Sequence, residues 1–140
     1  MKVVIDTNEL LSALISPYNP PSAILKAWLA GRFDLVTSED QLAEIRRVSR
    51  YERLKPFLMP LRAGLLLNKM RKAAVIIRTS EIQGPEAFDP NDNFLIEICE
   101  SSRANCLLTG DNRAGLLQRQ HIGPTEVMTA AQFANRYLSH

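Results

Sequence analysis

The stretch VVIDTN (residues 3–8) decides the fold of this chain, together with CLLTGD (residues 106–111). Each stretch is a short apolar run that stops at a polar residue, and the first run is wholly β-branched. Such continuous apolar runs are typical of strands buried on both faces, as in parallel sheets covered by helices. Asp6 and Asp111 therefore stand at the carboxyl ends of two predicted strands, where open parallel sheets bind their ligands.

Outward from these two runs, turn residues and apolar periodicity predict helices alternating with strands. Asn8 is expected to cap the first helix, and Gln41 stands three residues after Ser38 in the position of a capping box. This order predicts a single α/β domain over residues 1–140, with a parallel sheet covered on both faces. The expected helices lie at about 8–15, 20–30, from 38 onward, 50–72 with breaks at two prolines, 89–103, near 115–117 and 130–138, and the further strands at 33–36, 73–77 and 122–128.

Composition narrows the class of protein before any motif is considered. The chain has 140 residues, of which 46% are apolar and 23% charged, and it lacks an apolar run long enough for a membrane span. The opening residues show no signal-peptide pattern, so we expect a cytoplasmic protein. Cys99 and Cys106 are expected in the core, in a reducing compartment. With only two histidines, a His-based zinc site or a His-dependent hydrolase has almost no residues available.

The net charge of +2 hides two opposed blocks. Residues 46–78 contain ten Lys or Arg and one acid, a net charge of +9, and the rest of the chain carries −7. A basic segment beside acidic flanks favours a polyanionic partner that meets a carboxylate site. The alternative is a solvated helical face with no partner.

Four acids could form that carboxylate site, although each has an ordinary local explanation. Asp6 and Asp111 can be turn or cap residues, Glu44 can be a solvated helix residue, and Asp92 stands in the first turn of a predicted helix. Carboxylates that converge must take up protons or cations. Oxygen ligands without His or Cys suit Mg²⁺ or Mn²⁺, which can activate water and stabilise phosphoryl transfer.

The ordered set of motifs resembles the PIN-domain ribonucleases, above all the stand-alone type found as toxins of bacterial toxin–antitoxin pairs. The resemblance rests on VVIDTN with LSAL (11–14), Ser38 with Glu44, DPNDNFL (89–95) and LLTGD (107–111). Each motif is common by itself, but their order and spacing over essentially the whole chain is specific. The resemblance implies a three-layer α/β/α sandwich with a mainly parallel central sheet.

The resemblance also implies a function, a metal and a set of site residues. The implied activity is cleavage of RNA phosphodiester bonds by an Mg²⁺- or Mn²⁺-dependent endoribonuclease. The implied partners are RNA, a cognate antitoxin protein and a second copy of the chain. The residues that match the catalytic acids are Asp6, Glu44, Asp92 and Asp111, of which Asp6, Asp92 and Asp111 would hold the metal. Asn8, Thr109 and Asp89 match supporting positions, and arginines of the basic segment, namely Arg46, Arg47, Arg50 and Arg53, would hold the RNA backbone.

Two positions depart from the family pattern. Glu9 replaces an aliphatic residue, either as an extra acid near the metal or as a surface change. Arg113 stands where relatives often have another acid. If that acid holds a metal in relatives, this chain would bind metal more weakly, but the four main acids are present and a competent site is expected.

Other readings of the sequence stay open beside this one. A haloacid-dehalogenase-like phosphohydrolase would need an acid at Asn8, and a receiver-like domain would need paired acids after the first strand. A PIN fold with weak catalysis, acting as an RNA- or protein-binding module, is the non-enzyme alternative.

Overall fold

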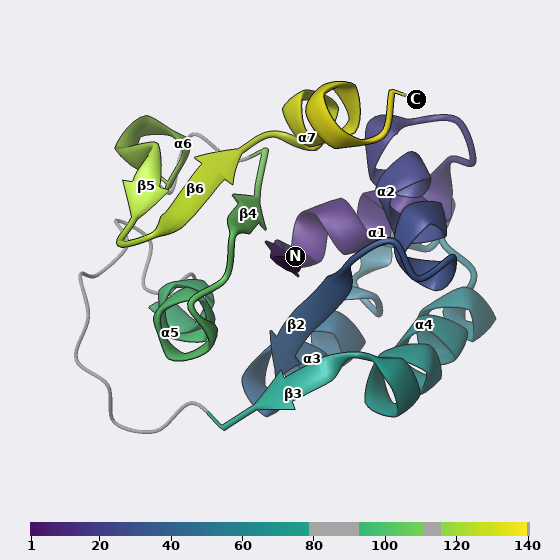
Figure 1. Ribbon diagram of the computed structural model, residues 1–140. Helices are drawn as coiled ribbons and strands as arrows, with labels where there is room; N and C mark the ends of the chain where they lie inside the picture. Colours follow the sequence, from purple (N-terminus) through teal and green to yellow (C-terminus); the bar gives the residue numbers. More distant parts are fainter. Residues whose placement is uncertain (79–92, 111–115, 140) are drawn as a thin grey trace.

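The computed structural model describes residues 1–78, 93–110 and 116–139 (Figure 1). No helix in these ranges is long and apolar enough to cross a membrane. The elements, in chain order, are β1 (Lys2–Ile5), α1 (Thr7–Ile15), α2 (Pro20–Leu29), β2 (Asp34–Ser38), α3 (Glu39–Val48), the 3-10 turn η1 (Glu52–Leu54), α4 (Pro60–Ala73), β3 (Val75–Ile77), α5 (Asn93–Ser102), β4 (Cys106–Leu108), α6 (Leu116–Arg119), β5 (His121–Ile122), β6 (Thr125–Met128) and α7 (Ala130–Tyr137).

The described strands form one sheet in the order β3-β2-β1-β4-β6-β5. Every neighbouring pair is parallel except β5 with β6, which confirms the predicted, mainly parallel sheet. The chain runs from β1 outward through β2 to β3, then returns to the other side of β1 as β4 (Figure 1). The strand order therefore reverses between β1 and β4, and ligand sites of open α/β sheets lie beyond the carboxyl ends of such strands.

Two apolar clusters fill the two sides of the sheet, because successive strand residues point to opposite faces. On one face, Val3 and Ile5 pack with helices α1, α2, α3, α4 and α7. On the other face, Val4 and Leu107 pack with α5, through Leu95 among others. This arrangement confirms the three-layer α/β/α sandwich.

The first turns of two helices differ from the prediction. Asp6, not Asn8, caps α1: its side chain accepts a hydrogen bond from the backbone N–H of Asn8, which lies inside the helix. Ser38 caps α3 as predicted, but the side chain of Gln41 turns inward instead of completing a capping box. A complete capping box is formed by Thr129 and Gln132 at the start of α7.

The single strand predicted at 122–128 is wrong, because the segment folds into the β5–β6 hairpin. Gly123 has φ +56° and is followed by Pro124, so the chain turns there instead of extending. The breaks predicted at two prolines within residues 50–72 are confirmed, since η1 ends at Leu54 and α4 begins at Pro60. Proline at the first helical position sacrifices no intrahelical hydrogen bond, which explains this start.

Candidate active site

Asp6 lies at the junction of β1 and β4, directly after Ile5, which pairs with Leu108. Its backbone N–H continues the ladder by donating to the carbonyl of Leu108 at 2.9 Å. The side chain is only 5% exposed. Its Oδ2 accepts a hydrogen bond of 2.8 Å from the Thr109 hydroxyl, and its Oδ1 accepts one of 3.3 Å from the N–H of Asn8. The sheet and the start of α1 together hold this carboxylate in place.

Thr109 and Gly110 form the other side of the junction. Thr109 is fully buried, and its N–H donates to the carbonyl of Met128. A Cβ added to Gly110 would lie 2.6 Å from Oε1 of Glu9, so the Glu9 carboxylate occupies the space beside this glycine. Burial, and then the neighbouring Asp6 carboxylate, raise the pKa of Glu9 above its usual value. Asp6, Thr109 and Glu9 therefore meet at this junction. The predicted convergence of Asp6 with Asp111 lies outside the described residues.

Glu44 lies on α3, where its side chain is 17% exposed and forms a 3.8 Å ion pair with Arg47. Glu44 is therefore partly buried, and is not the fully solvated helix residue of the alternative interpretation. Its helix packs against α1 and α5. Asn8, by contrast, has an exposed side chain and contributes its backbone N–H to the site.

Gln41 is a site-supporting residue that the sequence reasoning did not find. Its side chain is fully buried and its Nε2 donates to the carbonyl of Ile5 at 2.6 Å, while its Oε1 accepts from the Thr37 hydroxyl at 2.6 Å. Gln41 thereby ties α3 and β2 to the last residue of β1, immediately before Asp6. A glutamine in the first turn of a helix that follows a buried strand was the only available signal.

Three predicted site residues, Asp89, Asp92 and Asp111, lie outside the described residues. Within residues 1–78, 93–110 and 116–139, no group of three or more His, Cys, Asp or Glu side chains is arranged to hold a metal ion. The described part of the site is thus Asp6 with its hydrogen-bond partners Asn8 and Thr109, and the neighbouring Glu9. Glu44 on α3 is a further candidate residue.

Comparison with known protein families identifies the family of this chain. The sequence profile described as "PIN domain" matches residues 2–113, which include β1, β4 and all four predicted acids. This chain belongs to the PIN-domain family. No curated protein matches the sequence of this PIN domain significantly.

A solved structure shares the fold. The match is a chain of the crystal structure of VapBC2 from Rickettsia felis bound to a DNA fragment from their promoter, with a TM-score of 0.58. The two sequences are 18% identical over 92% of this PIN domain and 98% of that chain. At this identity the likeness bears on the fold alone.

The basic residues of the PIN domain separate into two groups. Arg46 and Arg50 line a hollow of about 640 Å³ between α3 and α4, together with Lys55. Arg47 and Arg53 instead gather on the ring of Tyr51, with guanidinium carbons 5.8 Å and 5.4 Å from its centroid. All four predicted arginines are exposed, so both groups are accessible to a polyanion.

The donors at the β1–β4 junction have the chemistry that a divalent cation requires. The described donors are the carboxylates of Asp6 and Glu9 and the hydroxyl of Thr109, all of them oxygens. Mg²⁺ and Mn²⁺ prefer such hard ligands. Gly110 has no side chain, and the Glu9 carboxylate lies in the space that a side chain there would occupy. The residues present therefore fit the metal that the family implies.

Proposed function

We propose that this PIN domain is an Mg²⁺- or Mn²⁺-dependent endoribonuclease and the toxin of a toxin–antitoxin pair. Membership of the PIN-domain family supports a nuclease, and the observation that carries the proposal is the buried Asp6 at the β1–β4 junction. Asp6, Asp92 and Asp111 would hold the metal, and Glu44 would assist directly or through water. A divalent ion bound there lowers the pKa of water and neutralises charge on the scissile phosphate.

The protein's own residues have defined tasks in this proposal. The Thr109 hydroxyl and the Asn8 N–H fix both oxygens of Asp6, so this carboxylate meets the cation without a reorganisation of its side chain. Arg46 and Arg50 would hold the phosphates that flank the cleaved bond, a contact that supplies affinity without reading sequence.

Cleavage of a mixed RNA pool tests the catalytic part. We expect the purified protein to cut RNA with Mn²⁺, to lose activity in EDTA, and to lose at least about a hundredfold in rate with Asp6→Asn, since removal of one main electrostatic group commonly has such an effect. The variant keeps a side-chain oxygen for the helix cap and should fold, which circular dichroism verifies.

The matched control is Asp34→Asn, the same change at an exposed residue that begins β2, at the amino ends of the parallel strands and away from Asp6. Its activity should equal that of the unmodified protein. Cleavage that survives both EDTA and Asp6→Asn would contradict the metal–carboxylate proposal. RNA binding without cleavage would instead favour the non-catalytic alternative.

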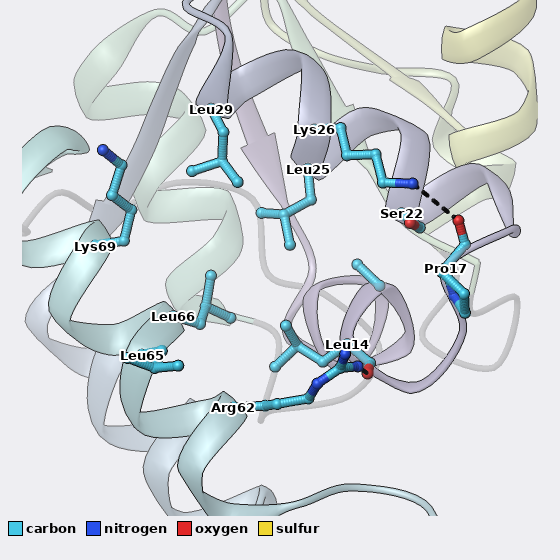
Figure 2. Close-up of a pocket in the computed structure, with 11 residues that line it drawn as sticks. Leu14, Pro17, Ser22, Leu25, Lys26, Leu29, Arg62, Leu65, Leu66 and Lys69 are labelled. Atoms are coloured by element: carbon cyan, nitrogen blue, oxygen red, sulfur yellow. Dashed lines mark hydrogen bonds between the residues drawn. The ribbon is translucent and has the colours of Figure 1, made fainter.

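A second surface supports an antitoxin partner. Helices α1, α2 and α4 enclose a hollow of about 440 Å³ whose floor and walls are leucines, including Leu14, Leu25 and Leu66 (Figure 2). Leu29 and Leu65 line it although they are 51% and 59% exposed. The other lining residues include three cations, Lys26, Arg62 and Lys69, and no acid. An amphipathic segment with apolar and acidic side chains complements this hollow.

A small open reading frame just upstream of the gene, where one is found, supplies the partner to test. We expect the two proteins to copurify after coexpression, and Leu29→Glu with Leu65→Glu to abolish copurification, because both changes place negative charge in the apolar hollow. The control is Leu61→Glu, which alters another exposed leucine of α4 that does not line the hollow. Copurification unaffected by the paired change would contradict this docking surface. Light scattering of the free protein tests the predicted homodimer.

A further inference from the structure

Glu9 lies at the β1–β4 junction in a way that the start of a helix does not explain. It is the third residue of α1, is half-buried, and its carboxylate lies beside the α-carbon of Gly110. A Cβ on Gly110 would stand 2.6 Å from Glu9 Oε1 and 3.6 Å from Glu9 Cδ. The carboxylate thus occupies the place of a side chain at the residue that follows Thr109, whose hydroxyl holds Asp6.

The ordinary structural role for a glutamate at this helix position is absent. In a capping box, Glu9 would accept a hydrogen bond from the backbone N–H of Asp6. That N–H instead donates to the carbonyl of Leu108 at 2.9 Å. Among residues 1–78, 93–110 and 116–139, no hydrogen bond to the Glu9 carboxylate is formed. The helix dipole favours an acid in the first turn, but it does not account for the half-buried position against Gly110.

We infer that Glu9 is an additional oxygen ligand of the divalent cation held at Asp6. This inference rests on the proposed function, because it assigns a new residue to the same metal site. Two carboxylates at one junction repel each other, and a cation between them converts the repulsion into attraction. Gly110 permits this position, since a side chain at residue 110 would displace the Glu9 carboxylate from where it lies.

Binding of Mn²⁺ alone, measured by calorimetry, tests the inference without any assay of cleavage. Glu9→Gln keeps the size of the side chain and removes its charge, and we expect at least about tenfold weaker binding, since removal of supporting carboxylates has effects of this order. Gly110→Ala should weaken binding comparably by displacing the flexible end of Glu9. The backbone at Gly110 lies outside the left-handed region, so alanine introduces no strain of its own.

Combining the two changes shows whether they act through one carboxylate. The double variant should bind Mn²⁺ as weakly as Glu9→Gln and no weaker, because the added methyl group has no charged carboxylate left to displace. Thermal unfolding supplies a second readout: Mn²⁺ should raise the midpoint of the unmodified protein more than that of Glu9→Gln. The control is Glu52→Gln, the same change at a side chain that is 87% exposed on η1, and it should bind as the unmodified protein does.

The outcomes separate this inference from the proposed function. If Asp6→Asn abolishes Mn²⁺ binding but Glu9→Gln binds like the unmodified protein, the role of Glu9 is overturned while the metal site stands. If the unmodified protein binds no Mn²⁺, both are overturned. The inference is supported if Glu9→Gln and Gly110→Ala each weaken Mn²⁺ binding and the double variant binds no more weakly than Glu9→Gln. Glu52→Gln should bind Mn²⁺ as the unmodified protein does.

Discussion

Replacing Gln41 with leucine should destabilise this PIN domain strongly, although the change keeps the volume of the side chain nearly constant. Gln41 is fully buried and makes two hydrogen bonds of 2.6 Å, one to the carbonyl of Ile5 and one from the hydroxyl of Thr37. Leucine can make neither. Gln41→Leu therefore removes the partners of a buried carbonyl and a buried hydroxyl at the base of the candidate site.

The magnitude follows from what is left unpaired. A buried polar group deprived of its partner costs about 1–3 kcal/mol, so two such groups amount to about 2–6 kcal/mol. The better burial of leucine offsets about 1 kcal/mol of this loss. We expect the free energy of unfolding to fall by about 1–5 kcal/mol, which is a large share of the about 5–15 kcal/mol typical of a whole domain.

Urea unfolding followed by circular dichroism measures this loss, with the slope against urea as a check that the unfolded state is unchanged. Thr37→Val is the matched comparison, because it leaves only the Gln41 carbonyl oxygen without its donor and should cost about 1–3 kcal/mol. The double variant should cost less than the sum, since both changes break the same Thr37–Gln41 bond. A loss below about 1 kcal/mol for Gln41→Leu would refute the reasoning.

Three further predictions follow from particular contacts. Thr109→Val removes the 2.8 Å hydrogen bond to Asp6 and should lower stability by about 1.5–3 kcal/mol at pH 7; an unchanged thermal midpoint would contradict the role of this hydroxyl. Arg46→Ala and Arg50→Ala should each weaken RNA binding for all sequences alike and reduce the salt dependence by about 0.7 per lost phosphate contact, and a change that depended on RNA sequence would argue against backbone contacts. Burial raises the pKa of Cys99 from 9.0 to about 12, so at pH 8 Ellman's reagent should react with the buried Cys99 and Cys106 only after unfolding. The Cys99 thiol stays protonated to a higher pH in the folded protein than in the unfolded chain, so its contribution to the free energy of unfolding is complete below about pH 9. That free energy should fall by about 1.4 kcal/mol per pH unit from about pH 9 toward pH 12. The Cys99→Ala variant should not show this fall.

Prediction from sequence succeeded where local patterns carry the information. The β-branched run before Asp6 and the apolar run before Thr109 specified buried parallel strands, and the two strands are neighbours in the sheet. The hydrogen bond between Asp6 and Thr109 at their carboxyl ends was found only in the structure. The prediction failed at Asn8, because an aspartate and an asparagine two residues apart can both cap a helix. Only the pairing of β1 with β4 makes Asp6 the last residue of the ladder and hence the cap.

The placement of Glu9 and Gln41 was beyond any local pattern. In the structure both residues stand at the third position of a helix, where a side chain can complete a capping box, although the sequence predicted one only for Gln41. In each case the side chain instead makes a contact across the sheet: Gln41 reaches the carbonyl of Ile5, and Glu9 reaches the space beside Gly110. These partners are 36 and 101 residues away in the chain, so only the folded sheet brings them together.

The sequence by itself determined the layered α/β architecture and the position of Asp6 at the end of a strand, because strand burial and helix periodicity are set by neighbouring residues. It also determined the block of positive charge at residues 46–78. The tertiary structure determined which of these residues lie close together in space. It divided the arginines between the hollow beside α4 and the ring of Tyr51, and it opened an apolar hollow between α1, α2 and α4 (Figure 2). Those groupings depend on which strands pair and how helices cross, and long-range packing alone sets both.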